Sequence, residues 1–399
     1  MLLDDKLPQK RSLERRWSMQ QGTTSTPTRE SAVWVYSPWF LGNPYQQQLT
    51  MCMADHDIAT MGGQNHGEAI RYLKTASHVD ERVWHVHWLN VVLSGAKTRE
   101  EAQQRVDSFT RSLDAMQKQG VRIVWTMHNV LPHESVFEDL EIKLREIICE
   151  RAEMIHIMNP ASAEAAAPYF ALPAEKLVRV EHPGYQGYYP QRFSRAGARA
   201  MLGFAPQERV SLVLGAIKPY KGLLEVAGVF DDISRAHPRK VNLLIAGGAG
   251  NDKGTRELLD LAALHPAIHV LPERIVPEDV YTLFAAADTA IIPYKASLNS
   301  GSLVLALSMG VPVIASSTAG STHLLADGAG VVYDTHEQLA AELLDTRWQD
   351  AARPAAARIA HRLRPQHIAE TFGRVARAFL DQGVVAARAV AGPDGGLDA

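Results

Sequence analysis

Short apolar runs alternate with longer amphipathic stretches along most of the chain. In the first half, the apolar runs predict strands at 32–36, 83–88, 121–126, 154–158 and 178–180. A polar stretch at 99–119 that ends at Gly120 predicts the longest helix between them. Apolar runs of this length are typical of parallel strands buried on both faces.

The same alternation restarts after residue 192. Further strands are predicted at 210–215, 241–246, 268–271, 289–292 and 311–315, with helices between them. Two rounds of strand and helix predict an α/β chain with two Rossmann-like, doubly wound domains that face a cleft. We place the domains at 32–192 and 193–365, followed by a helix at 366–384 that crosses back to the first domain.

The two ends of the chain lack this periodicity. Residues 1–31 are polar and predict a flexible extension, and residues 385–399 predict a disordered tail. Lys10, Arg11, Arg15 and Arg16 in the extension could touch an anionic surface, although a solvated tail is the simpler explanation.

Composition narrows the class of protein. The chain has 399 residues, 46% of them hydrophobic and 21% charged, and its net charge of −3 gives no reason to expect a nucleic-acid partner. We see no apolar run of the roughly 20 residues that a membrane helix needs, and no apolar core of a signal peptide. We therefore expect a cytoplasmic protein.

A candidate anion site lies in the loop after the strand at 289–292. Ser300, Gly301 and Ser302 begin a helix, whose free backbone N–H groups and dipole favour an anion. Lys218 and Lys221 lie in a Gly-bounded loop before another helix and could neutralise a diphosphate. The alternatives are an ordinary βαβ turn and two solvated lysines.

Histidines gather where strands of the first domain end. His128, His133 and Glu134 share one loop, and either His128 or Glu134 could act as the general base, a choice that the sequence leaves open. Glu134 could instead cap a helix. Asn43, His87, Asn129 and His133 also follow strands of this domain, although His87 could simply be a hydrogen-bonded histidine at a strand end.

Metal and cofactor signals are weak. Cys52 and Cys149 are far apart, the histidine spacing is not one of a zinc site, and no DxD pair follows a strand. We therefore expect neither a metal nor a cofactor.

The order of motifs resembles that of the GT-B fold glycosyltransferases. The resemblance rests on GAIKPYKG at 215–222, AGG at 246–248, AD at 287–288, IIPY at 291–294, SG at 300–301 and GVPVIA at 310–315. It implies that the first domain binds the acceptor and the second a nucleotide-sugar. It also implies that Gly215, Gly247 and Tyr294 contact the nucleotide and that Asn43, His87, Asn129 and His133 bind the acceptor.

One departure from that family stands out. Many retaining members carry two glutamates eight positions apart in this region, and the equivalent positions here hold Ser297 and Leu305. Neither can bind a ribose diol as a carboxylate would, so we expect the donor to be held differently.

The finer resemblance is to bacterial exopolysaccharide transferases, nearest to the xanthan-type, GDP-mannose-dependent β-mannosyltransferases. This implies inverting transfer to a lipid-linked oligosaccharide and peripheral contact with the inner face of the membrane, with the helix at 99–118 as a second candidate surface. The alternatives are a transferase that uses UDP-glucose or UDP-glucuronic acid, a sugar-nucleotide epimerase of the same fold, and a periplasmic-type sugar-binding protein.

Overall fold

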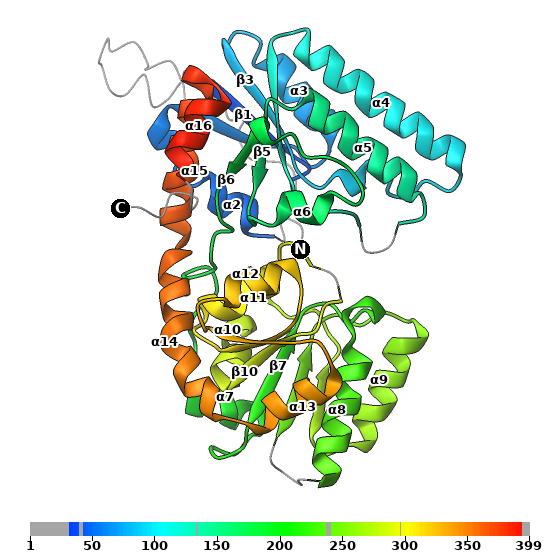
Figure 1. Cartoon of the computed structure of the whole chain (residues 1–399), viewed down its shortest axis with the longest axis vertical. Helices are drawn as coiled ribbons and strands as arrows, with labels where there is room; N and C mark the ends of the chain where they lie inside the picture. The colour runs from blue at the N-terminus through cyan, green and yellow to red at the C-terminus, as the bar shows by residue number, and fades with distance from the viewer. Residues whose placement is uncertain (1–31, 40–42, 133–134, 237–240, 296, 393–399) are drawn as a thin grey trace, which may run out of the picture.

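Two parallel β-sheets, each flanked by helices, make up the computed structural model (Figure 1). It describes residues 32–39, 43–132, 135–236, 241–295 and 297–392. The first sheet has the strand order β2-β1-β3-β4-β5-β6 and the second the order β12-β11-β10-β7-β8-β9. All of the strand pairs are parallel, which confirms the predicted α/β class and its two Rossmann-like domains.

The N-terminal domain holds the first sheet. Its strands are β1 (Ala32–Ser37), β2 (Ile58–Gly62), β3 (Glu81–Val86), β4 (Val121–Thr126), β5 (Met154–Ile157) and β6 (Leu177–Arg179). Its helices are α2 (Tyr45–Thr50), α3 (His66–Thr75), α4 (Arg99–Gln117), α5 (Glu138–Arg151) and α6 (Ser162–Ala166), with short 3₁₀ turns η1 (Met53–His56), η2 (Leu89–Val91) and η3 (Ala174–Lys176).

The C-terminal domain holds the second sheet. Its strands are β7 (Val210–Leu214), β8 (Asn242–Ala246), β9 (Ile268–Leu271), β10 (Thr289–Ile292), β11 (Val313–Ser316) and β12 (Gly330–Tyr333). Its helices are α7 (Arg195–Leu202), α8 (Leu223–Ala236), α9 (Lys253–Leu264), α10 (Pro277–Ala286), α11 (Gly301–Ser308), α12 (Ala319–Leu325), α13 (His336–Leu344) and α14 (Arg347–Arg362), with one 3₁₀ turn, η4 (Pro219–Lys221).

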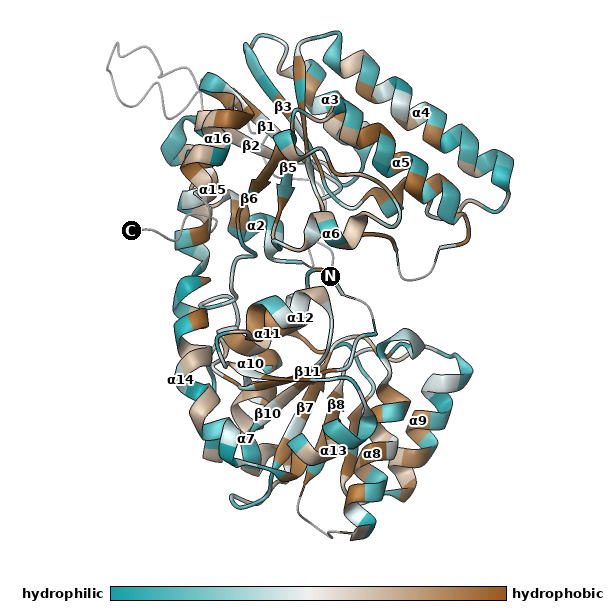
Figure 2. Ribbon diagram, viewed as in Figure 1, coloured by the Kyte–Doolittle hydropathy of each residue, from teal (hydrophilic) through white to brown (hydrophobic). Residues whose placement is uncertain are grey.

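Burial explains why most strands could be predicted from the sequence. Every residue of β1, β8 and β10 is buried, and Figure 2 shows hydrophobic strands inside helices whose outer faces are hydrophilic. The sequence pattern missed β2, because this edge strand buries only Ile58 and ends in glycine. It also missed α3, which follows at once and has a polar outer face.

The end of the chain returns to the first domain. After α14, Pro365 opens α15 (Pro365–Gln382), which packs against α2 and η1. The rings of Phe372 and Phe379 are fully buried, each with its centroid 6.1 Å from that of Trp34. The helix thus supplies part of the core of the N-terminal domain.

The predicted disordered tail is wrong for its first part. Residues 384–391 form α16 (Val384–Ala391), which buries Ala387 and Ala391. Arg388 donates hydrogen bonds to the carbonyls of Leu177 and Ala174, both at 3.0 Å. Small apolar residues let this helix cover the edge of the sheet at β6, which would otherwise be exposed. The predicted extension at 1–31 lies outside the described residues.

Candidate active site between the domains

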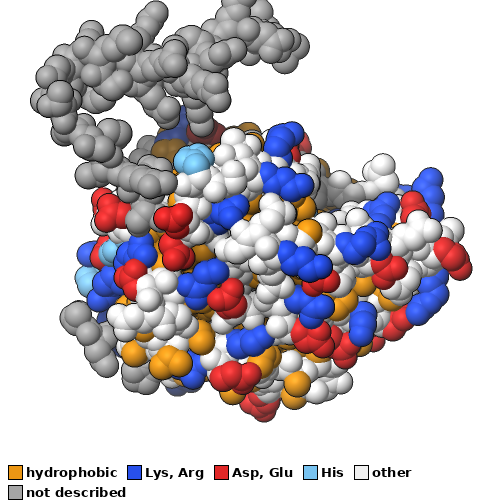
Figure 3. All heavy atoms as spheres, turned by 90° about the horizontal axis from the view of Figure 1, so that it is seen from above, with side chains coloured by type: hydrophobic (Ala, Val, Ile, Leu, Met, Phe, Trp, Pro, Cys, Tyr) orange, Lys and Arg blue, Asp and Glu red, His pale blue; other side chains and the backbone are white. Residues whose placement is uncertain are grey.

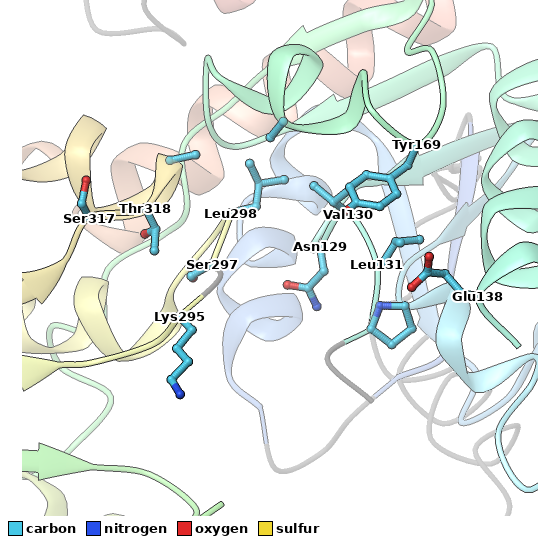
Figure 4. Close-up of a pocket in the computed structure, with 13 residues that line it drawn as sticks. Asn129, Val130, Leu131, Glu138, Tyr169, Lys295, Ser297, Leu298, Ser317 and Thr318 are labelled. Carbon is cyan, nitrogen blue, oxygen red and sulfur yellow. The ribbon is translucent and has the colours of Figure 1, made fainter. Parts of the chain in front are cut away.

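The carboxyl ends of both sheets meet at a cavity of about 460 Å³ (Figure 4). Asn129, Val130, Leu131, Pro132 and Tyr169 line it from the N-terminal domain, and Lys295, Ser297, Ser317 and Thr318 from the C-terminal domain. Ligands of open α/β sheets bind at this end of the strands. Asn129 lies in this cavity wall, and its contact with an acceptor stays a prediction.

Several polar groups converge in the C-terminal domain. A Cβ atom on Gly215 would stand 2.8 Å from Lys221 Nζ, 3.7 Å from Tyr294 Oη and 3.9 Å from Ser302 Oγ. The hydroxyl of Tyr294 is 3.0 Å from that of Ser302, and Lys221 Nζ lies 4.9 Å from the centroid of the Tyr294 ring. Four residues that the sequence assigned to the donor are thus brought together.

Lys221 is a buried cation. Only 8% of its surface is exposed, and burial lowers the pKa of its ammonium. Within the described residues no carboxylate lies within ion-pair distance of Nζ, so the charge is available to a ligand. Lys218, by contrast, has an exposed side chain, and its charge helps to lower the pKa of Asp252. The structure places only Lys221 in the convergence.

The start of α11 offers free amides, as predicted. The Ser300 side chain is buried, and its hydroxyl accepts a hydrogen bond from the amide of Leu303 at 3.2 Å as the N-cap. That cap leaves the N–H groups of Gly301 and Ser302 without an intrahelical acceptor. They lie at the positive end of the helix dipole.

Gly247 has a structural reason to be glycine. A Cβ atom there would lie 2.1 Å from the carbonyl oxygen of Gly215, so the ends of β7 and β8 could not approach. The glycine keeps Gly215, and with it Lys221, in place. A contact between Gly247 and a nucleotide stays a prediction.

Histidines fill the N-terminal side. His87 is fully buried, and its Nδ1 lies 2.9 Å from Nε2 of His128, whose ring stacks on Trp88 at 4.0 Å. The ring of His87 is thus enclosed in this structure, and its acceptor contact stays a prediction. Asn43 Oδ1 accepts a hydrogen bond from the Tyr45 amide at 3.0 Å, and its acceptor contact also stays a prediction.

These histidines are neutral at neutral pH. Burial lowers the pKa of His85, His87 and His128 well below the usual value, and that of His156 and His182 to about 4. A neutral imidazole is the form that a general base requires. His128 is the one proposed base that the structure describes, since His133 and Glu134 lie outside the described residues.

The loop before α11 reaches across to the N-terminal domain. The Asn299 side chain donates hydrogen bonds to the carbonyls of Met127 at 3.2 Å and His128 at 3.0 Å. The Asn159 side chain donates in the opposite direction, to Leu298 at 3.0 Å and Ala319 at 3.1 Å. Leu298 itself is buried among apolar residues of the N-terminal domain.

The two positions without carboxylates have clear roles. Ser297 lines the cavity, and its carbonyl accepts a hydrogen bond from the Gly320 amide at 3.2 Å. Leu305 is buried in the core under α11. Among the described residues, no group of three or more His, Cys, Asp or Glu side chains is arranged to hold a metal ion.

Sequence reasoning missed three residues at this cleft: His182, Tyr185 and Asn299. His182 and Tyr185 lie on the connection without regular structure that follows β6, and the sequence did not show that this connection turns toward α11. A Cβ atom on Gly301 would lie 3.0 Å from Tyr185 Oη and 4.0 Å from His182 Nε2. The HPGY sequence at 182–185 was visible, but its position opposite α11 was not.

Facing parallel sheets with a cleft at their carboxyl ends define the GT-B architecture. HepE of Anabaena, solved with UDP and glucose, aligns with a TM-score of 0.63 at 15% identity over 87% of this chain and 99% of that one. Sucrose-phosphate synthase of Thermosynechococcus elongatus gives a TM-score of 0.64 at 16% identity over 87% of this chain and 98% of that one.

The C-terminal domain carries the family signal. Residues 208–346 match the family model described as glycosyl transferases group 1. A D-inositol 3-phosphate glycosyltransferase of Nocardia farcinica is 29% identical over 204 residues, which are 49% of this chain and 45% of that protein. The chain thus spans less than half the length of this curated relative.

Proposed function

We propose that this protein is a glycosyltransferase that moves a sugar from a nucleotide-diphosphate sugar to a hydroxyl group of an acceptor. The observation that carries the proposal is the convergence of Lys221, Tyr294, Ser302 and Gly215 beside the free amides of α11. The group 1 glycosyl transferase match and the UDP-containing structures of HepE support it.

The chemistry follows from the two sides of the cleft. A base on the N-terminal side, His128 or Glu134, accepts the proton of the acceptor hydroxyl as its oxygen attacks the anomeric carbon. The bond from that carbon to the diphosphate oxygen breaks, and negative charge develops on the leaving diphosphate. Lys221 and the amides of Gly301 and Ser302 stabilise this charge, a role that a metal fills in other enzymes.

Donor and acceptor have two candidate identities. The sequence resemblance favours GDP-mannose, inversion and a lipid-linked oligosaccharide in exopolysaccharide synthesis. The comparisons favour a UDP-sugar and a small phosphorylated acceptor, since HepE was solved with UDP-glucose and the curated relatives are named for D-inositol 3-phosphate. Incubation with both donors and both acceptors, followed by anomeric analysis of the product, distinguishes transfer, stereochemistry and epimerisation.

Membrane contact would follow from a lipid-linked acceptor. In the described part of the chain, no helix combines the length and apolar character needed to cross a bilayer. The basic side chains of α4 are largely paired, as Arg99 is with Asp139 and Arg105 with Glu101, and Figure 3 shows cations and anions interspersed on this end of the molecule. Peripheral attachment at the cytoplasmic face stays a prediction.

Replacement of Lys221 tests the proposed donor site. We expect Lys221→Ala to lower kcat by about 10²- to 10³-fold, because the leaving diphosphate loses its buried cation. The measurement is steady-state transfer with the donor identified above. Lys143→Ala, on the exposed face of α5, is the matched control and should leave kcat unchanged. Unchanged kcat and KM in Lys221→Ala would remove this residue from the site.

A further inference from the structure

The connection after β6 brings a histidine to the start of α11. His182 Nε2 and Tyr185 Oη both face Gly301, at 4.0 and 3.0 Å from the point where a Cβ atom would stand. The His182 ring lies 4.9 Å from that of Tyr45 and 5.7 Å from that of Tyr185. An anion held by the amides of Gly301 and Ser302 would therefore meet His182.

Hydrogen bonding fixes the tautomer of this ring. His182 Nδ1 lies 2.7 Å from the carbonyl oxygen of Pro183. A carbonyl can only accept, so Nδ1 carries the hydrogen and Nε2 carries a lone pair. No hydrogen bond reaches Nε2 from the described residues. The ring thus presents a lone pair to a site whose other groups are donors and a cation.

The surroundings of His182 supply no fixed charge that would settle its protonation. The titratable groups that face it are Tyr45 on α2, Tyr185 on its own segment, His128 after β4, His156 on β5 and His323 on α12. The neighbouring carboxylate of Glu181 is 3.3 Å from the guanidinium of Arg362. Burial keeps the ring neutral, with its pKa lowered to about 4.

We propose that His182 is a further diphosphate-binding residue, and that it takes up a proton from solvent when a nucleotide-diphosphate sugar binds. The proton adds to the Nε2 lone pair, and the new N–H donates to a phosphate oxygen. The imidazolium and Lys221 then face the diphosphate from the two sides of α11. This inference rests on the proposed function, because it assumes that the anion at α11 is the diphosphate of a donor.

Calorimetry of donor binding tests the inference. GDP-mannose and UDP-glucose are titrated into the whole protein at pH 6.5, in two buffers with different ionisation enthalpies. Neither ligand titrates near neutral pH, so any proton taken up belongs to the protein. We expect uptake of about half to one proton for each bound donor, and an affinity that falls by up to about tenfold per pH unit between pH 6 and 8.

Two variants assign the proton. His182→Gln keeps a polar side chain but cannot be protonated, so its donor affinity should be about tenfold weaker at pH 6 and independent of pH. His323→Gln is the matched control, because His323 lines the same small pocket on α12 but does not face Gly301, and it should keep the proton uptake.

The outcomes separate the inference from the proposed function. Donor binding without proton uptake in the wild-type protein, or uptake that survives in His182→Gln, would overturn the role of His182 and leave the glycosyltransferase proposal standing. Failure of both nucleotide-sugars to bind the wild-type protein would overturn both. If His182→Gln does not fold, the absence of proton uptake in the wild-type titration would still overturn the role of His182.

Discussion

The ammonium nitrogen of Lys221 lies 2.8 Å from the point where a Cβ atom on Gly215 would stand. Gly215 has a φ of +134°, a conformation that residues with side chains rarely adopt. The sequence placed both residues in one motif, but it could not show which lysine of the loop turns inward. That depends on the single turn η4, which buries Lys221 and leaves Lys218 exposed. His87 shows the same limit, since a strand-end histidine can point into a core.

The glycine supports a prediction at this scale. We expect Gly215→Ala to weaken donor binding by at least tenfold, because the new methyl group displaces Nζ and the backbone is strained by about 1–3 kcal/mol. Calorimetric titration with a nucleotide-sugar measures the loss.

Gly228→Ala is the control, since nothing lies within 4 Å of its would-be Cβ atom in α8. That variant should bind the donor normally and unfold at a higher temperature, because alanine favours the helix by about 1 kcal/mol. Normal donor binding by Gly215→Ala would contradict the placement of the site.

Among the elements, the loops between strands and helices are what the sequence describes least well. Most strands of the C-terminal domain could be predicted closely, since β7, β8, β10 and β11 are largely buried apolar runs, whereas β9 and β12 are only partly buried. The reciprocal hydrogen bonds of Asn159 and Asn299 could not be predicted, because each joins a side chain to backbone carbonyls that are far away in the sequence. The edge strand β2 and helix α16 were missed or misread for a related reason, because neither has the long apolar pattern of a core element.

Loss of the Asn299 side chain should loosen the two domains. Asn299→Ala removes two hydrogen bonds worth about 1 kcal/mol each, so the cleft should open at least about tenfold more often. Hydrogen exchange by mass spectrometry should report faster exchange in the peptides that cover 127–132 and 297–300.

The control is Asn251→Ala, in an exposed turn before α9. It should exchange as the wild-type protein does in both peptides. Equal exchange rates in Asn299→Ala and the wild-type protein would show that the asparagine does not hold the domains together.

For the whole molecule, alternation of strands and helices was enough to predict two Rossmann-like domains, because each parallel strand needs a helical crossover. The sequence could not show that several histidines are buried together in the N-terminal domain. His85, His87 and His156 are fully buried in the N-terminal sheet. His85 and His156 are bridged by the Thr126 hydroxyl, at 2.6 and 3.0 Å.

These buried histidines predict an acid-sensitive N-terminal domain. The pKa of His156 is about 4 in the folded chain and about 6.5 when unfolded. The stability that neutral His156 contributes to the free energy of unfolding is therefore fully present above pH 6.5. It falls as the pH drops from 6.5 to 4 and is constant below pH 4, so this group alone lowers the free energy of unfolding by about 3 kcal/mol.

Tryptophan fluorescence can follow this loss, since Trp34, Trp39, Trp84, Trp88 and Trp125 lie in the N-terminal domain. The midpoint of thermal unfolding should fall steeply between pH 6.5 and 4.5. His361→Gln, which changes an exposed histidine, should follow the same curve. A midpoint that does not move with pH would argue against neutral histidines in the core.

The return of α15 and α16 to the first domain has a consequence for how the chain is made. The core around Trp34 needs Phe372 and Phe379, which are synthesised near the end of the chain. The C-terminal domain, from α7 to α14, is by contrast one continuous stretch of chain. The domain that is translated first therefore cannot complete its core until the last helices of the chain have been made.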